Sequence, residues 1–201
     1  MTSRAAIFLL LSISATFAAA AEIREFPVPT VERLGNELIR ASQRPDRGAS
    51  DPVRKRARQT AQTALKGRLF DTTYDAVVLN DPDGKGFLVY ALALADTRRV
   101  IQTGGHYRVT VSADGGTVER IDLLSGFIQL KLEKGKEPAI ITSTQFSSKL
   151  PTEAWLYTSS VYGVPVYLAT KDKSFWTIDK GKIHKFTKAE MDAVESKPRK
   201  K

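Results

Sequence analysis

The sequence contains no cysteine and only two histidines among its 201 residues. The lack of thiols excludes disulfides, thiolate metal sites, a cysteine nucleophile and a lipid-bearing N-terminal cysteine. The two histidines, His106 and His184, belong to no H-x-H or H-E-x-x-H pattern. A two-histidine metal site would also need a nearby carboxylate, and no local pattern supplies one. We therefore expect no metal site and no cofactor.

The common catalytic signatures are absent as well. The chain has no G-x-S-x-G nucleophile motif, no phosphate-binding Walker loop and no dinucleotide fingerprint. The run Asn80–Gly84 does not fit a calcium loop, because aligning Gly84 as the sixth position places Leu79 and Tyr90 at ligand positions. A glycan hydrolase would need two carboxylates across a cleft. The acidic candidates for that role are Glu119, Asp122, Glu133, Glu137, Glu153 and Asp172.

Long apolar runs are confined to the first residues of the chain. Arg4 precedes an apolar run from Ala5 to Ala15, and Ala18–Ala21 provides small residues of the kind that signal peptidases recognise. The run is short for a membrane span of roughly 20 residues. We predict that residues 1–21 are a signal peptide and that the mature chain has no transmembrane segment. Export of a small protein without disulfides is typical of bacteria, so we expect the protein to be periplasmic or secreted by a bacterium.

Basic residues outnumber acidic residues. The formal net charge is +9, and loss of the leader removes only Arg4, which leaves +8. Outside the cytoplasm such a charge favours an acidic protein, an anionic cell-envelope polymer or anionic lipid as partner. No nucleic-acid-binding motif is present, so a nucleic-acid partner is not expected.

Two helices are predicted in the N-terminal part. Thr30 is a suitable cap for the first, whose apolar positions Val31, Leu34, Leu38 and Ala41 have helical spacing. Asp51 caps the second, and Pro52 occupies its first position. The second helix has alanines on one side and basic residues on the other. The basic residues are Arg54, Lys55, Arg58 and Lys66. They form either a solvated helix face or a binding surface.

A hairpin at residues 104–121 is the clearest strand signal. Tyr107, Val109 and Val111 alternate with polar residues, which indicates a half-buried strand. Asp114-Gly115-Gly116 then favours a tight turn. The segment Phe87–Ala95 is apolar at successive positions, which predicts a central strand covered on both faces.

Further strands are predicted to the C-terminus. They include 155–159, 164–170, 175–178 and 183–186. Thr187 and Glu190 form a capping-box pattern that opens a short helix. Together these signals predict one α+β domain at 22–196, with N-terminal helices on a largely antiparallel sheet of about eight to ten strands. The strands could also divide into two subdomains near Gly135, and a β-barrel is the alternative architecture. Residues 197–201 are predicted to form a basic tail.

Aromatic residues are concentrated in the second half of the chain. Such residues form either core packing or a recognition surface, since Tyr and Trp provide rigid contact area. The candidates for a binding surface are Trp155, Tyr157, Tyr162, Tyr167 and Trp176.

One short segment resembles a known family. Residues 106–121 are similar to the closing hairpin of PepSY-type modules, which are small exported bacterial domains with a helix packed on an antiparallel sheet. The matching positions are Tyr107, Val109, Val111, Asp114, Gly115, Val118 and Ile121. The resemblance implies binding or protease inhibition and carries over no catalytic residue.

The sequence therefore favours a non-catalytic exported protein that binds another macromolecule, such as an inhibitor or immunity-type partner. Two alternatives stay open. One is an envelope hydrolase, which should hold titratable groups with shifted pKa values in a cleft. The other is a binder of anionic envelope surfaces, whose affinity should fall steeply with salt.

Overall fold

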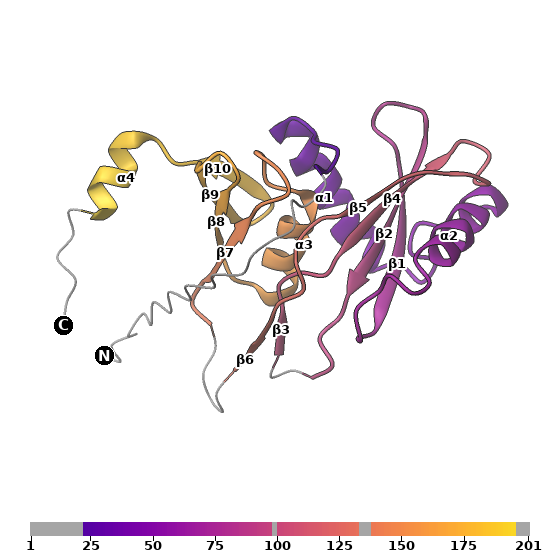
Figure 1. The fold of residues 1–201 in the computed structure, drawn as a ribbon, viewed down its shortest axis with the longest axis horizontal. Coiled ribbons are helices and arrows are strands. Elements are labelled where there is room, and N and C mark those ends of the chain that lie inside the picture. The colour runs from indigo at the N-terminus through magenta and orange to yellow at the C-terminus, as the bar shows by residue number, and fades with distance from the viewer. Residues whose placement is uncertain (1–21, 98–99, 133–137, 196–201) are drawn as a thin grey trace.

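The computed structural model describes residues 22–97, 100–132 and 138–195 (Figure 1). The predicted signal peptide (1–21) and basic tail (197–201) lie outside these residues, as does most of the predicted turn at 133–138. In the described part of the chain, no helix has the length and apolar character needed to cross a bilayer.

The described residues form an α+β fold, as predicted. The helices are α1 (Val28–Ser42), α2 (Pro52–Ala64), α3 (Glu153–Tyr162) and α4 (Lys188–Glu195). The strands are β1 (Tyr74–Asn80), β2 (Gly86–Ala93), β3 (Val100–Gln102), β4 (Tyr107–Ser112), β5 (Val118–Leu123), β6 (Gln129–Lys131), β7 (Ile141–Gln145), β8 (Val166–Thr170), β9 (Phe175–Asp179) and β10 (Lys182–Lys185).

The described strands belong to three sheets rather than one. Sheet 1 has the order β1-β2-β4-β5 and is antiparallel throughout. Sheet 2 has the order β10-β9-β8-β7, and β3 pairs with β6 in a two-stranded ribbon. One apolar core contains residues of both larger sheets, including Val77, Leu88, Leu168 and Ile178. The two sheets therefore share one interior, with α1 and α3 between them (Figure 1).

Strand β2 lies at the centre of sheet 1, as its apolar sequence predicted. It pairs with β1 on one side and with β4 on the other, and its residues from Leu88 onward are buried. One face packs against α2 through Val89 and Ala91. The other face packs against α1 and α3 through residues such as Tyr90 and Leu92.

Both N-terminal helices form, but only α2 begins as predicted. In α2, the Asp51 side chain accepts a hydrogen bond from the Arg54 backbone N–H at 2.9 Å, and Ala57 and Ala61 are buried. Helix α1 begins before Thr30, with Pro27 at its N-cap. Pro29 is compatible with this start because a proline in the first turn forfeits no intrahelical hydrogen bond.

The prediction of a strand at 155–159 was wrong, because these residues lie in α3. Gly163 ends the helix with a φ of 65°, and its N–H bonds back to Ser159 and Ser160. The residues from Glu153 to Ser159 are all buried, so these first two turns of the helix have no polar face, and only the last turn reaches the surface. Without a polar face the sequence shows no helical period, and its aromatic content resembles that of a strand. Because a helix connects β7 and β8, these two strands pair in parallel.

The C-terminal helix begins with the predicted capping box. The Thr187 N–H donates to Glu190 Oε2 at 2.7 Å, and the Glu190 N–H donates to Thr187 Oγ1 at 3.3 Å. These reciprocal bonds satisfy two backbone donors that a helix start leaves free. The capping box therefore sets the start of α4.

Candidate functional site

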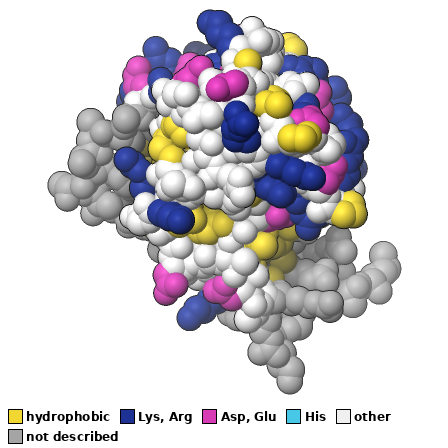
Figure 2. Space-filling model, turned by 90° about the vertical axis from the view of Figure 1, so that its right-hand side faces the viewer, with side chains coloured by type: hydrophobic (Ala, Val, Ile, Leu, Met, Phe, Trp, Pro, Cys, Tyr) yellow, Lys and Arg dark blue, Asp and Glu magenta, His cyan; other side chains and the backbone are white. Residues whose placement is uncertain are grey.

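The exposed side of α2 is strongly basic. Helix α2 contains no acidic residue between Pro52 and Ala64, whereas its buried side consists of small alanines. Figure 2 views the end of the molecule where α2 lies and shows Lys and Arg side chains spread across that face. We call the following residues the α2 basic surface: Arg54, Lys55, Arg56, Arg58 and Lys66.

Within the described residues, four of these five cations form no ion pair, although the Arg56 guanidinium lies 3.5 Å from the Asp114 carbonyl. Lys55, Arg56 and Lys66 are exposed, and Arg58 is half-buried. Arg58 donates to the Asp46 carbonyl at 3.2 Å. A bond to a neutral carbonyl holds a guanidinium in place without cancelling its charge. In the described ranges, none of these four side chains forms an ion pair with a carboxylate.

Arg54 is the least accessible member of the α2 basic surface. Its side chain is 21% exposed, and its Nε lies 3.5 Å from Asp51 Oδ2. It also donates to the carbonyl of Gly48 and to the side chain of Asn80. Arg54 therefore joins α2 to the end of β1 and to the loop between α1 and α2, and it has little freedom to meet a partner.

The predicted aromatic binding surface does not form. Trp155 and Tyr157 are buried in α3, and Trp176 is buried in β9. The indole N–H groups of the two tryptophans donate hydrogen bonds inside the protein. Trp155 donates to Gln145, and Trp176 donates to Thr170. These side chains serve the core, where aromatic groups with a satisfied polar atom pack well.

The other two predicted aromatic residues are also separated. The Tyr162 hydroxyl accepts a hydrogen bond from the Gln102 N–H at 2.7 Å and so connects α3 to β3. Tyr167 is 40% exposed on β8 and stacks on Phe186. The predicted aromatic residues therefore leave one accessible stacked pair, Tyr167 on Phe186, and do not come together as one surface.

A buried cluster of charges lies between β4, β5 and α3. Arg108 Nη1 is 2.7 Å from Glu153 Oε1, and Arg108 Nη2 is 2.8 Å from Asp122 Oδ2. All three side chains are at most 2% exposed. The Tyr90 hydroxyl donates to the same Glu153 oxygen at 2.9 Å. We call these four residues the Arg108 cluster.

The segment that enters the fold at residues 22–26 closes the Arg108 cluster. Arg108 donates to the carbonyl of Arg24, and the Phe26 ring lies 4.7 Å from the guanidinium carbons of both arginines. Arg24 in turn bonds both oxygens of Asp81, at 2.7 and 2.8 Å. Ile23 and Phe26 of this segment therefore form part of the interior.

The pKa shifts follow from burial and from these contacts. Burial alone lowers the pKa of Arg108, but the Glu153 carboxylate and its other partners raise it above its ordinary value. Burial raises the pKa of Tyr90 well above its ordinary value, and the Glu153 charge adds to that effect. Tyr90 is therefore a neutral hydrogen-bond donor, and Arg108 keeps its charge in the interior.

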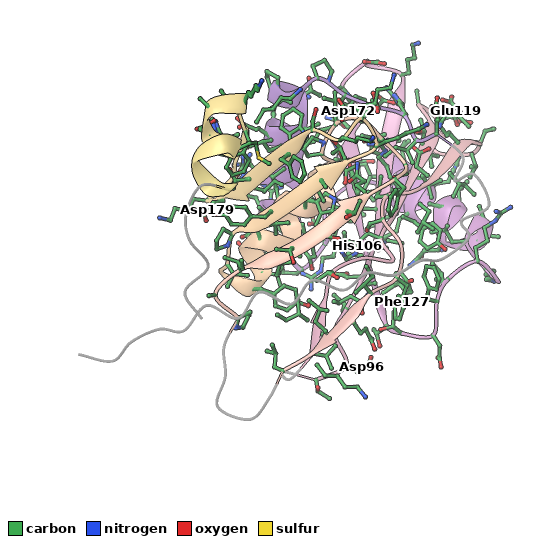
Figure 3. The ribbon with its side chains drawn as sticks, turned by 60° about the vertical axis from the view of Figure 1, so that its left-hand side comes forward. Asp96, His106, Glu119, Phe127, Asp172 and Asp179 are labelled. Atoms are coloured by element: carbon green, nitrogen blue, oxygen red, sulfur yellow. The ribbon has the colours of Figure 1, made fainter. Side chains whose placement is uncertain are left out.

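His106 precedes Arg108 by two residues in the chain and also lies in the interior (Figure 3). It is 1% exposed, its Nδ1 accepts a hydrogen bond from the Ala93 N–H at 3.0 Å, and its ring meets the Tyr157 ring edge-on. Burial lowers its pKa to about 4, so the imidazole is neutral at pH 7. Within the part of the chain that the structure describes, no group of acidic or histidine side chains has the arrangement of a metal site.

Strand β4 is buried on both faces, so the prediction of a half-buried strand was wrong. Its polar residues Arg108 and Thr110 are as inaccessible as its apolar ones, and so is His106 just before the strand. The sequence signal for the burial of both faces of β4 was indirect. Both faces of β2 were predicted to be covered by other elements, and a neighbouring strand of the same sheet can be covered by the same elements. Among the acidic residues considered for glycan hydrolysis, Asp122 and Glu153 are buried and paired with Arg108. Neither of these two carboxylates can reach a polymer substrate.

Comparison with known proteins found no relative: no protein-family model, no curated protein and no solved structure matches this chain. The resemblance of residues 106–121 to PepSY-type hairpins thus stays a prediction.

Proposed function

We propose that this chain is a non-catalytic exported protein that binds an acidic protein partner through the α2 basic surface, in the manner of an inhibitor or immunity protein. The observation that carries the proposal is the set of cations on α2 that lack carboxylate partners. An acidic protein surface is the complement that such a set attracts.

An acidic protein fits this surface better than a lipid bilayer does. A helix that lies in a membrane interface buries its own apolar face among the lipid chains. The apolar face of α2, formed by Ala57 and Ala61, is already buried against sheet 1. Arg56 and Arg58 also offer planar guanidinium groups, which recognise carboxylates in a bidentate manner.

The test compares binding by the chain and by two charge-reversed variants. Residues 22–201 are immobilised as wild type, as Lys55→Glu/Lys66→Glu, and as Lys131→Glu/Lys173→Glu. The last variant carries the same charge change at exposed positions on β6 and the β8–β9 turn. The defined probes are poly-L-glutamate and phosphatidylglycerol vesicles, followed by envelope proteins from the source cell.

We expect poly-L-glutamate and one acidic envelope protein to bind the wild type and the control variant. The α2 variant should bind both at least tenfold more weakly. Retention of the same protein by the α2 variant would overturn the proposal. Binding to vesicles in preference to acidic polypeptide would also overturn it and would favour an anionic membrane surface instead.

A further inference from the structure

A groove of about 270 Å³ opens at one end of sheet 1. Thr110 lies at its base, and β4 residues Val109 and Val111 on either side of Thr110 face α2. Because side chains alternate along a strand, the groove is on the sheet face opposite α2. Its walls are formed by Arg24, Asp81, Asp83, Lys85, Glu119 and Arg120.

A β-bulge shapes one wall of the groove. Thr110 pairs with Arg120 and Val111 pairs with Val118, so Glu119 has no partner across the strand pair. In a regular strand Glu119 and Arg120 would point to opposite faces. The bulge instead allows both residues to line the same groove, which is a common use of bulges at binding sites. Figure 3 shows Glu119 at the end of the β4–β5 hairpin, far from the interior position of His106.

The base of the groove contains a polar atom without a partner. Thr110 is 4% exposed, and its Oγ1 forms no hydrogen bond within the described residues. A buried hydroxyl without a partner is unfavourable, and buried polar atoms are normally satisfied. A ligand in the groove would supply the missing hydrogen bond.

Two charged side chains of the groove are also free to meet a ligand. Arg24 is paired with Asp81 and Asp83, and Arg120 is paired with Asp122. Among the residues that the structure describes, Lys85 and Glu119 form no ion pair, and both are exposed. The groove thus presents one ammonium and one carboxylate group, and the unpartnered Thr110 hydroxyl is buried beneath them.

We propose that this groove binds a small zwitterion of the α-amino acid class. The ligand carboxylate would meet Lys85 and the Thr110 hydroxyl, and its ammonium group would meet Glu119. Three acidic and three basic residues line the groove, so its balanced charge favours a ligand without net charge. Its volume lies just below the roughly 300 Å³ at which pockets for drug-sized ligands begin, which suits a small metabolite.

The test is a titration of ¹⁵N-labelled residues 22–201, followed by NMR. The probes are glycine, L-alanine and L-glutamine. N-acetyl-L-alanine, which lacks the ammonium group, and L-alanine amide, which lacks the carboxylate, are the matched controls. We expect saturable shifts of the amide signals of Lys85, Thr110 and Glu119 with at least one amino acid. N-acetyl-L-alanine and L-alanine amide should each bind at least tenfold more weakly than L-alanine.

Three variants test the assigned contacts. Glu119→Gln and Lys85→Gln should each weaken binding at least tenfold, whereas Glu37→Gln on α1 should leave binding unchanged. Thr110→Val keeps the shape of the side chain, so it should weaken binding without lowering the melting temperature. The proposal fails if no amino acid gives saturable shifts, if N-acetyl-L-alanine binds as well as L-alanine, or if Glu119→Gln binds like the wild type. These outcomes are independent of the α2 basic surface, which lies on the opposite face of sheet 1.

Discussion

Arg108 in β4 and Glu153 in α3 form an ion pair of 2.7 Å, and each side chain is 1% exposed. The two residues are 45 positions apart in the sequence. Their contact joins sheet 1 to the helix that connects two strands of sheet 2. The ion pair therefore holds together the two halves of the chain, in an interior where charges are tolerated only when they are paired.

Replacing Arg108 should destabilise the fold strongly. In Arg108→Met, the carboxylates of Glu153 and Asp122 lose their buried partner. Removing one member of a buried ion pair typically costs about 3–5 kcal/mol. Urea unfolding at pH 7, followed by circular dichroism, measures the free energy of unfolding.

The control for this variant is an exposed ion pair. Arg33 and Glu37 pair at 2.9 Å on the surface of α1, and Arg33→Ala should cost only about 0.3–0.5 kcal/mol. Equal losses in the two variants would show that the Arg108 cluster is not a special source of stability.

The buried histidine should make the fold sensitive to mild acid. The pKa of His106 is lowered by burial from 6.5 to about 4. Below pH 6.5 the unfolded chain binds a proton at this imidazole, but the folded chain does not until about pH 4. The stabilisation is therefore complete above pH 6.5 and is lost as the pH falls from 6.5 to 4, by about 3 kcal/mol at 1.36 kcal/mol per unit.

Two measurements check this expectation. NMR titration of the imidazole signals should give a midpoint near pH 4 for His106, and a midpoint near 6.5 would refute the prediction. Urea unfolding at pH 7 and pH 4 should show a smaller acid loss for His106→Asn than for the wild type.

The close contact between α1 and α3 depends on a glycine. A Cβ added to Gly35 would lie 2.7 Å from the Cβ of Leu156. Alanine is favoured over glycine in a helix by about 1 kcal/mol, but this contact forces the two backbones apart. We expect Gly35→Ala to lower the melting temperature, with a net cost of about 1–3 kcal/mol typical of overpacking. Gly126→Ala, whose added Cβ would meet no atom within 4 Å, is the matched control and should melt like the wild type.

The cap of α2 can be tested by a single substitution. Asp51→Ala removes the acceptor for the Arg54 N–H, and loss of such a cap costs about 1 kcal/mol. Thermal unfolding should show this loss, and Asp51→Asn, which keeps an acceptor, should restore most of it. If Asp51→Asn were as unstable as Asp51→Ala, the contribution of Asp51 would come from its charge and not from the hydrogen bond.

Local chemistry was sufficient to predict many of the elements. The start of α2, the capping box of α4, the β4–β5 turn and the central place of β2 each depend on residues within a few positions of one another. Four members of the α2 basic surface, Arg54, Lys55, Arg58 and Lys66, were also predicted, because helical spacing alone places them opposite the alanines, whereas Arg56 was not. The prediction that Thr30 caps α1 was wrong for a local reason, since Pro27 and Pro29 both fit the start of a helix.

The remaining features were decided by tertiary packing. The sequence alone determined which segments have alternating apolar and polar residues, which form turns and which cap helices. These preferences arise from the backbone and from neighbouring side chains. The sequence did not determine that α3 is a helix or that Arg108 is buried. Both depend on which elements cover a segment, and a helix buried on all sides loses the polar face that reveals its period. The Arg108 cluster and the groove at Thr110 bring together residues from distant segments, so only the packed fold could place them.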